Sequence, residues 1–370
     1  MKIFILLLFI ILAAGCAANQ PQEEAPSITA GAEPATDESI RDADAEPPAY
    51  ENGANQGTGV EPASGAEPVL GVESGIMEVS VFGIGRADAI LIRTESYAVM
   101  IDTGERQHGR PIVGYLRSQG ISAIDYLIIT HFDSDHVGGA YIILRDMQVA
   151  QVIVPNYSRD TNHVMRFESA LRYAGLEPLV LTEPLELTLD GARFIIDPTG
   201  LEYMHFPRAD EPGFGEYSED YETDNAADYA YERWGFAPTS DDFSIIVRIT
   251  HGANNFLFTG DAWNIRLQEL LENDELMGVA YDFLKVPRHG RHSRSSVPFI
   301  HATSPRYAVI TGFHPEYAER YYSERPADAR VIAALEYVGA QIFFTMSVGV
   351  RAESDGSRLV VEYRHFFGSD

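Results

Sequence analysis

The stretch THFDSDHVGG, residues 130–139, follows the apolar run YLII and places two histidines and two aspartates within six residues. The apolar run predicts a buried strand that ends in a polar loop, and Gly138 and Gly139 allow a helix to begin close behind it. Buried imidazole and carboxylate groups are costly when unpaired, whereas around a divalent cation they satisfy each other. The stretch therefore predicts a strand-and-helix fold built around a metal site with the ligands His131, Asp133, Asp135 and His136.

Short apolar, β-branched runs alternate with amphipathic stretches over residues 76–370, which is typical of a layered α/β fold. The first three runs, MEVSVFGI, DAILIRT and YAVMID, are so closely spaced that they predict an antiparallel meander. Later runs, including FSIIVRITH, NFLFTGD, FLKVP and YAVIT, predict a second sheet in the second half of the chain, which closes with QIFFTM, VGVRA and LVVEYR. We expect one domain at residues 76–370, folded as a four-layer αββα sandwich.

The first 15 residues, MKIFILLLFIILAAG, have one lysine and an apolar run that is too short to cross a membrane comfortably. They predict a signal peptide, and the following Cys16 resembles the lipid-modified cysteine of a bacterial lipobox. An ordinary signal peptide with a chance cysteine is the alternative. Cys16 is the sole cysteine, so an exported chain offers it no disulfide partner, and lipidation gives it a role. We expect an exported protein, anchored to the bacterial membrane through Cys16, with its domain outside the cytoplasm.

Residues 16–75 are rich in Ala, Pro, Glu and Gly and show no hydrophobic periodicity. Such a segment cannot bury enough apolar surface to offset its chain entropy, so it predicts a disordered acidic linker. The formal net charge of the whole chain is −28, and the acidic excess is shared by the linker and the domain. A field of that sign repels nucleic acid and anionic lipid, although a metal site can invert it locally.

Two further candidate ligands stand at predicted strand ends downstream, Asp261 in FLFTGD and His289 in LKVPRHG. With them, the motifs resemble the metallo-β-lactamase superfamily. The family pattern HxHxDH followed by Gly is matched by residues 131–138, with Asp133 in place of one histidine, and Asp102 in VMIDTG is similar to the aspartate of the first motif. Asp261 and His289 are similar to the fourth and fifth motifs.

Within the superfamily, the chain most resembles the extracytoplasmic domain of competence-type DNA-uptake channel proteins. The segments that carry this resemblance are IGRADAILI, THFDSDHVGG, DDFSIIVRI, FLFTGD and LKVPRHGR. The membrane channel of those proteins has no counterpart in the printed sequence, so the resemblance implies a tethered, standalone domain.

The resemblance implies a hydrolase with two divalent metal ions that activate a water molecule. It places Asp135, His136 and His289 on one ion and His131 and Asp133 on the other, with Asp261 bridging; Asp135, His136 and Asp261 are the expected catalytic residues. Asp102 and Gly138 are expected to support the metal-binding loop. Because Asp133 makes its site richer in carboxylate, manganese or iron is plausible beside zinc.

Two motif positions depart from the family. The histidine of the third motif has no clear match, since His163, His205 and His251 are each expected to be surface or packing residues. Arg288 replaces the first histidine of the double-histidine motif, and the later GHP is Glu324, Arg325 and Pro326. Arginine cannot ligate a metal, but it can hold an anionic group.

The substrate is predicted from charge. The basic segment RHGRHSRSS would draw a phosphoester or phosphodiester towards the metal, although it could equally neutralise an acidic surface. The residues expected to bind substrate are Arg288, Arg291, His292, Arg294 and Asp242. Residues 202–242 combine acids with aromatics and predict a lid, with a cation site or calcium site as alternatives.

Three functions remain open from the sequence. A metal-dependent hydrolase of small or polymer-attached phosphoesters is favoured. A nuclease near a DNA-uptake system agrees with the motifs, but the acidic domain disfavours binding to a polymeric nucleic acid. A binding module that keeps the fold without turnover is the third. No sequence feature indicates an oligomeric state.

Overall fold

The computed structural model of the chain describes residues 75–206, 237–317 and 326–367. The predicted signal peptide, Cys16, almost all of the linker, and most of the acidic aromatic segment 202–242 lie outside the described residues. Within the described ranges, no helix is long and apolar enough to cross a membrane.

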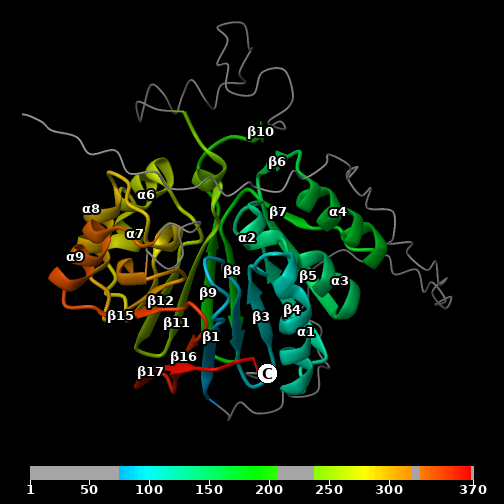
Figure 1. Cartoon of the computed structure of the whole chain (residues 1–370), viewed down its shortest axis with the longest axis horizontal. Helices are drawn as coiled ribbons and strands as arrows, with labels where there is room; N and C mark the ends of the chain where they lie inside the picture. The colour runs from blue at the N-terminus through cyan, green and yellow to red at the C-terminus, as the bar shows by residue number, and fades with distance from the viewer. Residues whose placement is uncertain (1–74, 207–236, 318–325, 368–370) are drawn as a thin grey trace, which may run out of the picture. The chain divides into compact units, whose positions relative to one another are not determined.

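The first sheet has eight strands (Figure 1). Its order is β17 (Leu359–Arg364), β16 (Gly349–Ser354), β1 (Met77–Val81), β2 (Ile90–Arg93), β3 (Ala98–Ile101), β4 (Ala123–Ile128), β5 (Gln148–Pro155) and β7 (Leu179–Leu181). β1, β2 and β3 pair antiparallel, which confirms the predicted meander. β3, β4, β5 and β7 pair parallel, so their carboxyl ends lie along one edge.

The second sheet has seven strands, and a further sheet of two strands is separate from both. The order of the second sheet is β15 (Gln341–Phe344), β14 (Tyr307–Ile310), β13 (Phe283–Lys285), β12 (Asn254–Phe258), β11 (Ile246–His251), β9 (Ala192–Asp197) and β8 (Leu185–Leu189). The small pair joins β10 (Met204–Phe206) to β6 (Tyr157–Arg159) in parallel.

The helices lie on the outer faces of the two sheets (Figure 1). On the first sheet lie α1 (Gly109–Ser118), α3 (Ala140–Asp146) and α4 (Asn162–Ala174), and on the second lie α6 (Asn264–Leu271), α8 (Ser296–Thr303) and α9 (Ala329–Tyr337). Single turns are α2 (Ser134–Val137) and α7 (Asp274–Met277), and the 3-10 turns are η1 (Arg106–His108), η2 (Ser240–Phe243), η3 (Pro287–Gly290) and η4 (Pro315–Tyr317).

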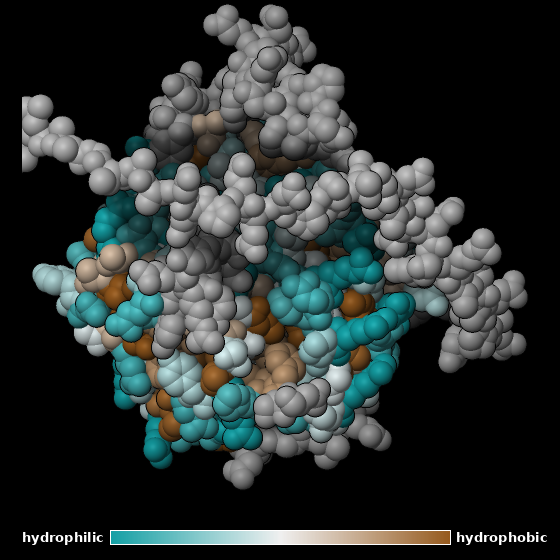
Figure 2. Space-filling model, viewed as in Figure 1, coloured by the Kyte–Doolittle hydropathy of each residue, from teal (hydrophilic) through white to brown (hydrophobic). Residues whose placement is uncertain are grey.

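Buried apolar side chains form three layers. One layer joins the first sheet to its helices, for example Leu127 to Ile143. The middle layer joins the two sheets, for example Val79 to Phe258. The third joins the second sheet to α6, α8 and α9. Two sheets with helices on both outer faces confirm the predicted four-layer αββα sandwich. On the surface, hydrophilic and hydrophobic residues are interspersed over the described part of the face shown in Figure 2.

The sequence predicted the last two strands but did not assign them to a sheet. In the structure, β16 pairs antiparallel with β1 and brings the chain end back to the first sheet. The pairing buries both strands' apolar faces, because Val79 lies opposite Ala352 and Val81 opposite Val350. The helix α8 was also not predicted, since its segment SVPFIHAT contains Pro298 and is short.

Candidate metal centre

Four chain segments meet where strands of the two sheets end. Asp102 follows β3 and residues 131–136 follow β4, whereas Asp261 follows β12 and His289 lies in η3 after β13. Since β3 and β4 are parallel neighbours, as are β12 and β13, each pair delivers its polar residues to one edge. The sandwich therefore brings together residues that are far apart in the sequence; Asp102 and His289 are 187 positions apart.

Asp102 braces the loop that carries the first histidines. Its φ of +58° is uncommon for a residue other than glycine and places its carboxylate under the loop. One oxygen accepts the Thr130 N–H at 2.8 Å, and the other accepts the Thr130 hydroxyl at 2.7 Å and lies 2.8 Å from His136 Nδ1. These bonds fix the His136 ring, in agreement with the supporting role expected for Asp102.

Gly138 and Gly139 let α2 and α3 pack against the same loop. A side chain at Gly138 would collide with the Ser134 carbonyl oxygen and the Arg106 backbone, and one at Gly139 would collide with the Thr103 carbonyl oxygen. The two glycines thereby allow the single turn α2 to direct His136 inwards, where the ring is fully buried.

Four residues form what we call the inner half of the cluster: Asp135, His136, Asp261 and His289. Asp261 Oδ1 lies 3.3 Å from His136 Nε2, and Asp261 Oδ2 lies 3.4 Å from His289 Nε2. Asp135 Oδ2 lies 3.2 Å from the same His289 nitrogen. The sequence placed all four on metal, and the structure brings neighbouring pairs of their potential ligand atoms to 3.2–3.4 Å.

Three residues form the outer half of the cluster: His131, Asp133 and Asp241. Their potential ligand atoms lie within 4.8 Å of one another, and His131 Nε2 is 3.9 Å from Asp241 Oδ1. His131 also groups with His136 and Asp261, so the two halves are contiguous. Asp133 is paired with Arg159, and Asp241 with Arg288 at 2.6 Å.

The hydrogen bonds of the histidines leave their Nε2 atoms free for a cation. His289 Nδ1 lies 2.8 Å from the Thr311 carbonyl oxygen, which can only accept, so Nδ1 carries the proton. His136 Nδ1 donates to Asp102, and His131 Nδ1 lies 3.2 Å from the Thr130 hydroxyl, which itself donates to Asp102. Such bonds on the far nitrogen are the usual support of a metal-ligating imidazole.

Several buried atoms of the cluster have no hydrogen-bond partner among the described residues. They are the Nε2 atoms of His131, His136 and His289, the Oδ1 atom of Asp261 and the Oδ2 atom of Asp241, the last of which faces the Arg288 guanidinium at 2.6 Å. Leaving such atoms unpaired inside a protein would be costly, whereas a divalent ion among them would satisfy those that coordinate it. The residues present therefore fit a metal ion.

The electrostatics of the cluster also favour a cation. Burial alone would lower the pKa of His136, but Asp261, Asp102 and Asp88 raise it well above its ordinary value. Burial would likewise lower the pKa of His289, and Asp261 with Asp135 raises it. The inner half thus has an excess of carboxylate that attracts positive charge, which a divalent ion can supply.

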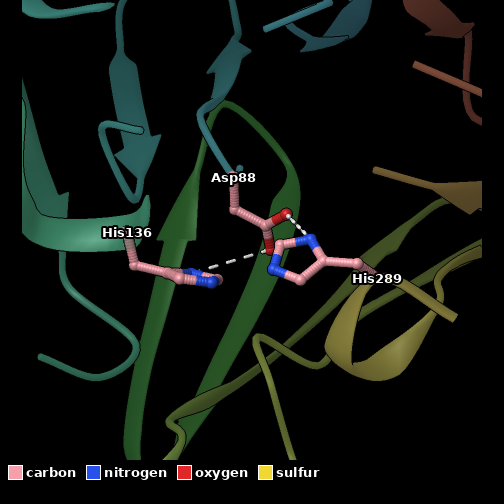
Figure 3. Close-up of side chains that lie close together, drawn as sticks. All are labelled: Asp88, His136 and His289. Carbon is pink, nitrogen blue, oxygen red and sulfur yellow. Dashed lines mark ion pairs between the residues drawn. The ribbon is translucent and has the colours of Figure 1, made fainter. Parts of the chain in front are cut away.

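Asp88 and Lys285 belong to the site but were missed by the sequence analysis. Asp88 lies between His136 and His289, with carboxylate oxygens 3.8 Å and 3.5 Å from their Nδ1 atoms (Figure 3). Lys285 is fully buried, pairs with Asp88, and donates to the Gly260 carbonyl oxygen at 2.8 Å. Their signal was a charged residue inside each of the apolar motifs ADAILI and FLKVP.

Asp241 was missed, while its neighbour Asp242 was predicted to bind substrate. Both oxygens of Asp242 are used inside the fold: one accepts the Ile265 N–H at 2.9 Å and the other the Thr239 N–H and hydroxyl, both at 2.9 Å. Asp242 therefore holds the start of α6, and its predicted role is corrected. Asp241 faces the cluster instead, where burial and Asp261 raise its pKa to about 7 against the lowering effect of Arg288.

Two of the basic residues predicted to bind substrate, Arg288 and Arg291, lie near the Trp263 ring. The Arg288 guanidinium stands 4.1 Å from the centre of the Trp263 ring, and that of Arg291 stands 5.9 Å from it. His292 is half-buried and Arg294 is exposed. Of this group, Arg288 is the residue that the structure brings into contact with the cluster.

None of the three histidines considered for the third motif enters the cluster. His163 Nε2 lies 2.8 Å from the Phe132 carbonyl oxygen, and His251 bonds the Ser354 hydroxyl between the sheets. His205 is exposed beside Ser158 and Asp160. Residues 318–325, which include two of the residues in place of GHP, lie outside the described part.

Removal of the Asp242 carboxylate tests its corrected role. We expect Asp242→Ala to lower the free energy of unfolding by about 1–3 kcal/mol, because the N–H groups of the buried Ile265 and of Thr239 lose their acceptor. The metal content should stay that of the unaltered protein. Urea unfolding and metal analysis measure the two effects, and a loss of metal with unchanged stability would return Asp242 to the site.

Comparison with known proteins agrees with this geometry. Residues 83–223 match the model of the metallo-beta-lactamase superfamily. The chain is 24% identical over 252 residues to ComE operon protein 3 of Bacillus subtilis, covering 63% of this chain and 28% of that protein. It is 32% identical over 84 residues to Recombination protein 2 of Haemophilus influenzae, covering 21% of this chain and 10% of that protein. The chain thus spans less than a third of either relative.

Among solved structures, the metallo-beta-lactamase fold protein YhfI from Bacillus subtilis is similar with a TM-score of 0.43 and 12% identity, covering 73% of this chain and 95% of that one. The family match, the two-sheet sandwich and the buried histidine–aspartate cluster together make this chain a metallohydrolase with the metallo-β-lactamase fold.

Proposed function

We propose that the chain hydrolyses phosphoesters outside the cytoplasm, tethered to the bacterial membrane through lipidated Cys16. The observation that carries the substrate class is the pairing of arginines with the cluster. Arg288 and Arg159 each place a guanidinium on a carboxylate at its edge. Such groups match the oxygens of a phosphoryl group in geometry and charge, so an ester with that group is held beside the metal site.

The chain's own residues position the reacting groups. Asp102 and the Thr311 carbonyl hold His136 and His289 with their Nε2 atoms facing Asp261. Manganese or zinc bound there supplies a nucleophilic water at neutral pH and a Lewis acid for the ester oxygen. Lys285 forms an ion pair with Asp88 and lies 3.6 Å from Asp261, so its positive charge partly neutralises these two buried carboxylates.

Hydrolysis of bis(p-nitrophenyl) phosphate tests the proposed reaction. We expect turnover by protein purified without chelator, loss of turnover after dialysis against EDTA, and recovery on addition of manganese or zinc. Turnover that persists without metal, or a metal-loaded protein that leaves the ester intact, would contradict the proposal. Cleavage of plasmid DNA at physiological salt would favour the nuclease instead. The acidic chain is expected to bind a polymer of phosphates poorly, so such cleavage would show a specific DNA site.

Fractionation of cells tests the proposed anchor. The full chain is expected in the membrane fraction and its Cys16→Ser variant in the soluble fraction of the cell envelope, since the lipid supplies the attachment. A membrane-bound Cys16→Ser variant would contradict lipidation at that residue and favour an uncleaved signal segment.

A further inference from the structure

The two halves of the cluster differ in what neutralises their carboxylates. In the outer half, Asp133 contacts the Arg159 guanidinium and also lies 3.4 Å from the Ser240 hydroxyl. Asp241 Oδ2 lies 2.6 Å from Arg288 Nη2. Each outer carboxylate therefore already has a cationic partner, and a guanidinium does not lose its charge at any working pH.

The inner half has more carboxylates than lysine and arginine partners among the described residues. Asp88, Asp135 and Asp261 converge there; Lys285 is shared by Asp88 and Asp261, and Arg86 lies 3.5 Å from Asp135. The other groups at these carboxylates are the imidazoles of His136 and His289, which are themselves possible metal ligands. Three of the five buried cluster atoms without a hydrogen-bond partner also belong to the inner half; of the two in the outer half, Asp241 Oδ2 already faces Arg288. Both charge and unpaired ligand atoms thus favour the inner half for a divalent ion.

The two arginines are held in place by the fold. Arg288 adopts a left-handed backbone with φ of +49°, and its guanidinium lies on the Trp263 ring at 4.1 Å. Trp263 directly precedes α6, which fixes the position of the ring. Arg159 ends β6, which pairs with β10. A cation entering the outer half would have to break both ion pairs and remain close to two positive groups.

We infer that Arg159 and Arg288 occupy the charge position of a second metal ion, so that the protein binds one ion tightly in the inner half. This rests on the proposed metal-dependent hydrolysis. The arginines then stand beside the single ion, where their guanidinium groups bind the non-reacting oxygens of the phosphoryl group. The bridging position expected for Asp261 becomes that of a ligand to one ion.

Manganese titration of the full chain tests the inference, with equilibrium dialysis for stoichiometry and electron paramagnetic resonance for coupling between ions. We expect one tightly bound, magnetically isolated manganese per unaltered chain. The double variant Arg159→Ala, Arg288→Ala is expected to bind a second, spin-coupled ion with an affinity increased on the order of 100-fold, because both repelling charges are gone. Arg288→Gln, which keeps a polar side chain but removes one of the two charges, should give a smaller increase of about tenfold.

Arg291→Ala is the matched control, since it removes one positive charge from the same segment, and it should leave the stoichiometry at one. Two ions of similar affinity in the unaltered protein would overturn the inference and leave the proposed hydrolysis standing. A second ion absent from both Arg288→Gln and the double variant would overturn it as well. Failure of every form to bind manganese or zinc would overturn the proposed function and this inference together.

Discussion

The Asp261→Asn variant is expected to lose both tightly bound metal and hydrolytic activity. The two oxygens of Asp261 face the Nε2 atoms of both inner histidines, at 3.3 Å from His136 and 3.4 Å from His289. An amide keeps the shape but removes the charge and turns one ligand oxygen into a donor. The loss of metal affinity should exceed the roughly 10–100-fold that removal of an outer hydrogen-bond partner of a ligand costs.

Isothermal titration with manganese and the bis(p-nitrophenyl) phosphate assay measure the two losses. Asp242→Asn is the matched control, because it makes the same change at a carboxylate that holds α6. An Asp261→Asn protein with normal metal affinity and turnover would show that the cluster is not the catalytic site.

The Lys285→Met variant is expected to have the largest effect on stability. Lys285 is fully buried and its ammonium group contacts Asp88, which is 1% exposed, and lies 3.6 Å from Asp261. Methionine of similar length would leave a buried carboxylate without its cation. Removal of one partner of a buried ion pair costs about 3–5 kcal/mol, which would show as a lower urea midpoint of unfolding.

A double-mutant cycle separates this pair from general damage to the core. Asp88→Asn combined with Lys285→Met should be less destabilised than the sum of the single variants, because the second change removes the unpaired charge left by the first. Strictly additive losses would show that the pair is not coupled and that Lys285 acts through packing alone.

Most of the fold followed from the sequence because its strands are short apolar runs bounded by turn residues. The meander β1 to β3 and the run of strands β11 to β14 are examples. The placement of β16 and β17 did not follow, since an alternating pattern shows which face is buried but not which sheet edge the strand joins. Pairing of β16 with β1 is a long-range contact decided by the open edge of the first sheet.

The sequence predicted the site residues that stand as histidines and aspartates after a strand, as in residues 131–136. It did not predict those whose charged group is part of an apolar run. Asp88 and Lys285 look from the sequence like isolated charges at the ends of buried strands, and only their meeting across the two sheets gives them a partner. Asp241 and Asp242 are adjacent acids, and the turn of η2 alone decides which of them faces the cluster.

The most direct test of the account is an anomalous difference map from crystals grown with manganese. We expect a peak among the Nε2 atoms of His136 and His289 and the carboxylate of Asp261. Full-length chain soaked in manganese that shows no peak there, or a peak at exposed carboxylates only, would contradict the claim that this buried cluster is the metal centre.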